Sequence, residues 1–203
     1  MIINFTDKYQ FQTRLKLNTN NIEVVDRMKI LGTTFTNDLS WNLNCSIIIK
    51  KVNARMQLLR KVWSFGSSQQ EMVHLWKVFC LSVLEQSCVL WGSGLTNENV
   101  TDLERTQKTF TKLVLEEDYR TYNEALLSLG LCSLQDRRKA LTLRFAKQSL
   151  ADGHFADLFP KRRSQHDMEK RLKEEFKVFR AHTNRYKNSP ILTMQRLLND
   201  EEQ

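Results

Sequence analysis

The fold is decided by residues 39–66, which read LSWNLNCSIIIKKVNARMQLLRKVWSFG. Apolar residues recur here at the spacing of one face of an α-helix. They are Leu39, Leu43, Ile47, Val52, Met56 and Leu59. The stretch ends at Phe65-Gly66, where glycine is favoured just past the last turn. It therefore predicts one long amphipathic helix in a mainly helical protein.

The same stretch is strongly basic. No acidic residue occurs between Asp38 and Glu71. The basic residues of the predicted helix are Lys50, Lys51, Arg55, Arg60 and Lys61. Phosphate groups of a nucleic acid could lie along them, because Lys and Arg neutralise the phosphate backbone. A solvated helix face is the ordinary alternative, so these five residues are candidates for nucleic-acid binding.

Further helices are predicted downstream. Ser68 with Glu71 forms a capping-box pattern, and the helix that follows it reaches about Trp91. Between Leu75 and Trp91 it is apolar on nearly every side, which is typical of a helix buried inside a bundle. A third helix begins near Thr96 or Asn97 and carries charges of alternating sign.

Three more helices complete the predicted bundle and its tail. A short one covers about residues 122–129 and ends at Gly130, and Ser133 caps a longer one that ends near Asp152-Gly153. Ser189-Pro190 then begins a last helix, since proline is favoured at the first helical position.

Upstream of residue 39 the pattern is that of short strands. Residues 11–17 alternate apolar and polar side chains, residues 18–21 (Asn-Thr-Asn-Asn) indicate a turn, and residues 22–25 and 28–35 read as two more strands. Gly32 inside the last one suggests a bulge or the close approach of another chain segment. We expect a mainly α fold, a helical bundle preceded by a small antiparallel β-hairpin region. Its predicted parts are a β-hairpin region (1–38), a bundle (39–152) and a basic, partly helical tail (153–203).

The tail has its own charge pattern. Residues 161–187 hold ten Lys or Arg against four Asp or Glu, with Phe176, Phe179 and Tyr186 between them. Aromatic rings beside cations can stack on unpaired bases. The alternative is a mobile segment without a ligand.

Composition narrows the classes of partner and compartment. The chain has a formal net charge of +8 and a pI of about 9.4, which favours a polyanionic partner. Cys45, Cys80, Cys88 and Cys132 form no zinc-ligand spacing, and we expect them to be buried free thiols in a reducing compartment. The most apolar stretch, residues 78–91, is too short to span a membrane. We expect an intracellular protein, nuclear or cytoplasmic, with no membrane partner.

Five segments, in order, resemble non-LTR retrotransposon reverse transcriptases downstream of their catalytic motifs. The segments are Met28–Trp41 (MKILGTTFTNDLSW), Lys50–Arg60 (KKVNARMQLLR), Ser82–Trp91 (SVLEQSCVLW), Leu103–Lys108 (LERTQK) and Leu129–Arg138 (LGLCSLQDRR). The likeness covers about residues 22–150. Gln86 departs from the family pattern, which has tyrosine after the glutamate.

The resemblance implies roles for these segments. Leu31 and Gly32 would lie in the primer-grip hairpin, and the helices from Leu39 onward would be a thumb that packs on an RNA or DNA template–primer duplex. The palm and fingers would be missing partners, because the resemblance implies a chain that starts after them. We therefore expect no polymerase activity and no metal or cofactor.

Two acidic segments could be mistaken for catalytic ones. Phe155-Ala156-Asp157 imitates the start of the Phe-Ala-Asp-Asp motif, but Leu158 stands where the second Asp would be. We expect the segment to be a short apolar anchor that packs Phe155, Leu158 and Phe159 on the bundle. Glu116-Glu117-Asp118 could bind a metal but reads more simply as a solvated helix end.

One function of another class stays open. The chain could be a domesticated helical module that binds a protein and has no nucleic-acid role. An exposed apolar patch on residues 11–35 would favour that alternative.

Overall fold

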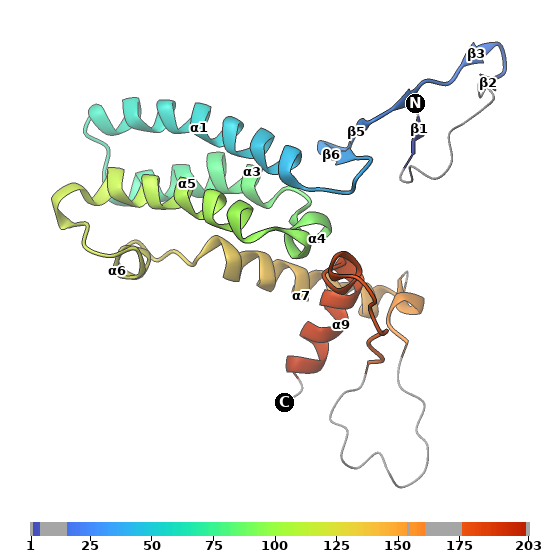
Figure 1. Cartoon of the computed structure of the whole chain (residues 1–203). Coiled ribbons are helices and arrows are strands. Elements are labelled where there is room, and N and C mark those ends of the chain that lie inside the picture. Colours follow the sequence, from blue (N-terminus) through green and yellow to red (C-terminus); the bar gives the residue numbers. More distant parts are fainter. Residues whose placement is uncertain (1, 5–15, 154, 161–175, 202–203) are drawn as a thin grey trace, which may run out of the picture. The chain divides into compact units, whose positions relative to one another are not determined.

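The protein is mainly helical, with short strands before the helices (Figure 1). The computed structural model describes residues 2–4, 16–153, 155–160 and 176–201. The mainly helical content, with short strands before the helices, confirms the predicted fold class. The chain divides into two compact units, one of residues 1–86 with 95–130 and the other of residues 87–94 with 131–203.

Helix α1, Asn42–Ser64, is the long helix predicted from residues 39–66. Its buried face carries Asn44, Cys45, Ile48, Val52, Met56 and Leu59. Leu39 was expected on this face, but it precedes the helix with a positive φ of 53° and remains 40% exposed. The helix starts three residues later because Ser40 and Asn42 take part in a turn closed by Asp38 and Thr36.

The second predicted helix is interrupted. Helix α2, Gln69–Leu75, begins at the predicted capping box, in which Ser68 and Glu71 bond each other's backbone N–H groups. These bonds lower the pKa of Glu71. The chain continues as the π-helix η1, Trp76–Leu81, and as α3, Ser82–Glu85. It then breaks, because Gln86 leaves helical geometry and Ser87 has a left-handed backbone.

The expectation of a helix buried on all sides is therefore wrong in part. Trp76, Cys80 and Leu84 are buried, whereas Val78 and Phe79 are about half exposed. Beyond the break, α4, Cys88–Trp91, and the 3-10 turn η2, Gly92–Gly94, belong to the other unit.

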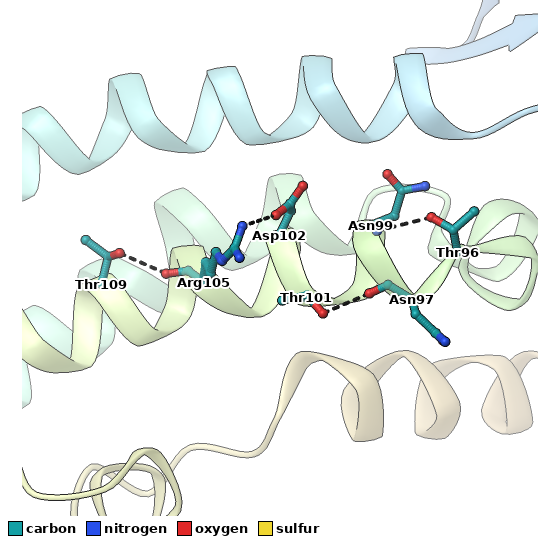
Figure 2. Close-up of polar contacts among 7 residues, drawn as sticks. All are labelled: Thr96, Asn97, Asn99, Thr101, Asp102, Arg105 and Thr109. Carbon is teal, nitrogen blue, oxygen red and sulfur yellow. Dashed lines mark hydrogen bonds and ion pairs between the residues drawn. The ribbon is translucent and has the colours of Figure 1, made fainter.

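Helix α5, Asn97–Leu115, packs against α1 in the first unit (Figure 1). Thr96 caps its N-terminus, as Figure 2 shows. Asn42 and Asn99 bond near the start of both helices, and Trp63 and Glu116 bond near their ends. The two helices thus run parallel. The 3-10 turn η3, Glu116–Asp118, and helix α6, Tyr122–Ser128, follow.

Short strand pairs precede α1. Strand β1, Ile2–Ile3, pairs in parallel with β4, Val24–Val25, and β2, Lys16–Leu17, pairs antiparallel with β3, Asn20–Asn21. Asn18, with a positive φ, makes the predicted turn between β2 and β3. The predicted strand over residues 11–17 lies outside the described residues except at its last two.

The predicted strand over residues 28–35 is in fact a hairpin. Strand β5, Arg27–Ile30, pairs antiparallel with β6, Thr33–Thr36. Leu31 and Gly32 form the two-residue turn, and both have positive φ. Gly32 therefore reverses the chain rather than making a bulge. The backbone N–H of Thr34 donates to Asn44 Oδ1 at 3.0 Å, which fixes the hairpin to α1.

The second unit packs α7, Leu134–Asp152, against α4 and against α9, Pro190–Glu201. Ser133 caps α7 as predicted. The core contains Ala146, Phe159, Phe176, Met194 and Leu198. Between α7 and α9 lie the 3-10 turn η4, Ala156–Leu158, and α8, Asn184–Lys187. Most of the predicted basic tail, residues 161–175, lies outside the described residues.

Within the described part of the chain, no single helix is both long and apolar enough to cross a bilayer. The consecutive segments Gln69–Glu85 and Cys88–Gly94 reach that length and composition only when they are taken together.

Candidate nucleic-acid interface

Helix α1 places most of its cations opposite its buried face. A helix turns about 100° per residue, so Lys50 and Lys61, about three turns apart, lie in one row roughly 16 Å long. Val52 and Met56 are buried on the other side. Arg60 and Lys51 are exposed and flank the row on either side. We call Lys50, Lys51, Arg60 and Lys61 the basic row of α1.

Arg55 is placed differently from the other four predicted cations. It is only half exposed, and its Nη1 donates to the backbone carbonyl of Phe79 in η1. Phe79 lies in the π-helix, whose i,i+5 hydrogen bonds replace the usual i,i+4 pattern, and its carbonyl also accepts from Ser82 Oγ at 3.4 Å. Arg55 thus connects α1 to η1, whereas the four residues of the basic row are exposed to solvent.

The predicted primer-grip residues form the tip of the β5–β6 hairpin. Leu31 is 91% exposed and has a φ of 47°, an unusual backbone angle for a residue with a side chain. Gln86 Nε2 donates to the Leu31 carbonyl at 3.3 Å. Gly32 has a φ of 89°, and a Cβ there would collide with the Gln86 amide. Gln86, where the sequence departs from the family pattern, therefore supports this turn.

The Leu103–Lys108 segment, one of those that carry the resemblance, has a structural role. Leu103 is fully buried. Tyr122 of α6 donates to Glu104 Oε2 at 2.6 Å and accepts from Gln107 Nε2 at 3.1 Å. Burial, followed by the bond to Glu104, raises the pKa of Tyr122 far above its ordinary value. Sequence reasoning missed this tyrosine because its partners lie on another helix. The only available signal was its position just after the Thr121 cap.

The Leu129–Arg138 segment is also structural. Gly130 has a positive φ, Ser133 caps α7, and Leu134 is buried. Arg138 is buried too and packs on Gly92, where an added Cβ would approach its Cδ to 3.3 Å. Buried residues of this segment therefore build the core of the second unit.

The acidic segments offer no metal site in the described residues. No group of three or more His, Cys, Asp or Glu side chains gathers there in a way that could hold a metal ion. Glu116 instead accepts a hydrogen bond from Trp63 Nε1 at 2.6 Å. Asp157 lies in η4, a 3-10 turn rather than a strand hairpin.

The prediction of buried free thiols is confirmed for three of the four cysteines and is wrong for Cys132. Cys45, Cys80 and Cys88 are buried, Cys132 is exposed, and none forms a disulfide among the described residues. Burial raises the pKa of Cys80 to about 11, although the nearby Arg55 charge opposes the shift. A thiol with so high a pKa is a weak nucleophile at neutral pH.

The predicted aromatic residues of the tail separate into two groups. Phe176 is buried and bonded through its backbone to Asn199, at 2.9 and 3.0 Å. Phe179 and Tyr186 are about half exposed. Of the predicted apolar anchor, Phe159 is buried, whereas Phe155 and Leu158 remain about half exposed. Only part of the anchor therefore packs as expected.

No family model, curated protein or solved structure matches this chain. The likeness to reverse transcriptases therefore stays a prediction from the five sequence segments.

Proposed function

We propose that this chain is the thumb-like, non-catalytic region of a non-LTR retrotransposon reverse transcriptase, and that it binds a primer–template duplex. The observation that carries the proposal is the basic row of α1. It lies on a helix of 23 residues without a single acidic side chain. Such a helix presents only positive charge to a polyanion.

The dimensions of α1 suit a duplex. A helix of this length extends about 34 Å, close to one turn of double-stranded nucleic acid. Lys50 and Lys61 are spaced so that both could contact phosphates along one groove, and the flanking Lys51 and Arg60 widen the contact. Such contacts position a duplex without reading its sequence.

A charge-neutralising variant tests the proposal. Lys50, Arg60 and Lys61 changed together to Gln should weaken binding to a DNA duplex or an RNA–DNA hybrid by at least about tenfold at low salt. The slope of log affinity against log salt should fall by about 2 to 3, because each lost phosphate contact contributes about 0.9. Fluorescence anisotropy at several salt concentrations measures both.

Helix α5 offers the matched control. Arg105, Lys108 and Lys112 are also one Arg and two Lys on an exposed helix surface. Changing these three to Gln removes the same charge and should leave affinity and salt slope nearly unchanged. Equal losses of affinity in the α1 and α5 variants would mean that net charge alone explains the binding. Such a result would overturn the proposed site on α1.

The non-catalytic part of the proposal has its own test. The sequence contains no adjacent pair of Asp residues of the kind that holds the two catalytic metal ions of polymerases. Purified chain, incubated with a primed template, Mg²⁺ and deoxynucleotides, should give no extended product. Template-dependent extension would contradict this proposal.

One observation favours the alternative of a protein-interaction module. Val24, Ile30 and Leu31 are exposed apolar residues in the hairpin region. Leu31 stands out, because a nearly fully exposed leucine on a strained turn has no role in packing. If the three changed together to Ser left duplex binding intact and abolished capture of a protein partner, this second function would be supported.

A further inference from the structure

The second unit contains an apolar cavity that the proposed duplex interface does not use. Its volume is about 560 Å³, within the range of pockets that bind small molecules. Its walls come from segments far apart in the sequence, including Leu90 of α4, Phe145 of α7, the η4 region and Pro190–Met194 of α9. It is therefore a product of the fold and not of one helix face.

Aromatic rings surround the opening of this cavity. Phe155, Phe179 and Tyr186 line it while their side chains remain 51%, 42% and 48% exposed. Phe159, which is buried, forms the inner wall. Half-exposed rings around a concave apolar surface are unusual on a surface without a ligand.

Cations accompany the rings. Arg144 precedes Phe145, Arg185 and Lys187 flank Tyr186, and Lys177 Nζ lies 5.5 Å from the Phe179 ring centroid. Lys177, Arg185 and Lys187 are exposed, and no acidic residue occurs between residues 176 and 199. Lys177 thus places a positive charge beside one ring of the cavity, and the other three cations are adjacent to its rings in sequence.

We propose that this cavity binds the unpaired bases of a single-stranded nucleic acid. The rings would stack on bases, and the neighbouring cations would bind the phosphates that connect them. A duplex does not fit this role, because its base faces are covered by their neighbours. The cavity belongs to a different unit from the basic row of α1, so the two sites can fail independently.

One acidic residue of the cavity favours a nucleic-acid base over a simple anion as the ligand. Asp157 lines the cavity, and a carboxylate there repels a phosphate or a fatty-acid head group. The same carboxylate can accept hydrogen bonds from the exocyclic amino group of cytosine. A base at the wall with its phosphate among the cations satisfies both charges.

The experiment compares two ligands with equal backbone charge. Full-length chain is titrated with a fluorescent single-stranded oligodeoxycytidylate and with an abasic oligonucleotide of the same length. The chain should prefer the base-containing strand by at least about fivefold, the lower limit for one stacked base. Equal affinity for the two strands would overturn the proposal, because charge alone would then explain binding.

Single substitutions show which side chains cause the preference for the base-containing strand. Tyr186→Leu and Phe179→Leu keep an apolar side chain but remove the ring, and each should reduce the preference for bases by about fivefold. Tyr186→Phe keeps the ring and should retain it. Leu127→Ala, at an exposed apolar residue of the other unit, is the control that should change nothing.

Further outcomes distinguish other ligands and the proposed duplex interface. A fluorescent fatty acid that binds the cavity and is lost in Phe179→Leu, with no base preference, would assign the cavity to an amphiphile instead and overturn the proposal. The α1 variant at Lys50, Arg60 and Lys61 should lose duplex binding and keep the preference for bases. Loss of that preference in the α1 variant would also overturn the proposal that the second unit has a separate binding site.

Discussion

Helices α1 and α5 lie side by side in the same unit and bury similar faces, yet their outer faces differ. Helix α1 buries Val52 and Met56, and α5 buries Leu103 and Phe110. Over its whole length α1 has five Lys or Arg and no acid, whereas α5 has three basic and three acidic residues. Packing therefore does not require the positive charge of α1. The excess charge is not needed for packing, which supports the proposal that α1 contacts a polyanion.

The polar contacts of α5 show what an ordinary outer face looks like. Figure 2 shows that Arg105 pairs with Asp102, and that Thr101 and Thr109 bond backbone carbonyls one turn earlier. These contacts are satisfied within the helix. On α1 only Arg55 among the five cations has a described partner of this kind, the Phe79 carbonyl.

The largest expected effect tests whether the buried faces are equivalent. Phe110 stacks on Trp76, with ring centroids 4.5 Å apart and planes 14° apart. Phe110→Ala should lower the free energy of unfolding by about 3 to 5 kcal/mol, because it leaves a cavity in the core. Met56→Ala on α1 should cost about 2 to 5 kcal/mol. Chemical denaturation measures both, and a negligible cost for Met56→Ala would break the comparison.

The next effect concerns the polar contact of α5 with α6. Tyr122→Phe removes the hydroxyl that bonds the Glu104 carboxylate and should cost about 1.5 to 3 kcal/mol at neutral pH. Helix α1 has no carboxylate side chain, so it offers no equivalent hydrogen bond that a substitution could remove. Urea denaturation of both proteins at pH 7 gives the difference, and a cost near zero would show that this bond does not hold α6.

The same tyrosine gives α5 a predicted pH dependence. The pKa of Tyr122 is raised in the folded state, so the unfolded chain loses this proton first as the pH rises. Its contribution is complete below about pH 10, the pKa of an unfolded tyrosine, and declines above it. Tyr122→Phe should show a smaller loss of stability between about pH 10 and 11. Equal losses in the two proteins would contradict the raised pKa.

These contacts also show how far the sequence could predict the structure. The caps at Ser68, Thr96 and Ser133 are local patterns, and all three begin helices where expected. The break at Gln86–Ser87 and the reversal at Leu31–Gly32 were missed, because each depends on a distant segment: the Gln86 amide bonds the Leu31 carbonyl. Periodicity describes one segment at a time and cannot show such a pairing.

The candidate site was predictable to a similar extent. The sequence pattern identified the five basic residues of α1 as candidates. Only the folded structure shows that Arg55 donates a hydrogen bond to the Phe79 carbonyl of η1. The aromatic cavity was partly visible as Phe179 and Tyr186 among cations. Phe155, Leu90 and Ile191 could not be added to it, because only folding brings them to the same wall.

A smaller effect separates Arg55 from the basic row within α1. Arg55→Gln removes the bond to Phe79 and should cost about 1 kcal/mol of stability, reduced from the value for a buried bond because the side chain is half exposed. Duplex affinity should change less than in Lys61→Gln. Thermal denaturation and anisotropy on both single variants provide the comparison. A larger loss of duplex affinity in Arg55→Gln than in Lys61→Gln would mean that Arg55 also contacts the duplex.

The smallest expected effect is on the outer face of α5. Asp102 and Arg105 form an exposed i,i+3 ion pair at 2.5 Å. Asp102→Asn should lower stability by no more than about 0.5 kcal/mol, because water and salt screen such pairs. It also makes α5 more basic by one charge and leaves Arg105 without its carboxylate. If position along α1 matters and net charge does not, this variant should gain no duplex affinity. A gain comparable to the loss in Lys61→Gln would mean that any uncompensated cation on this unit binds duplex, and the distinction between the two helices would disappear.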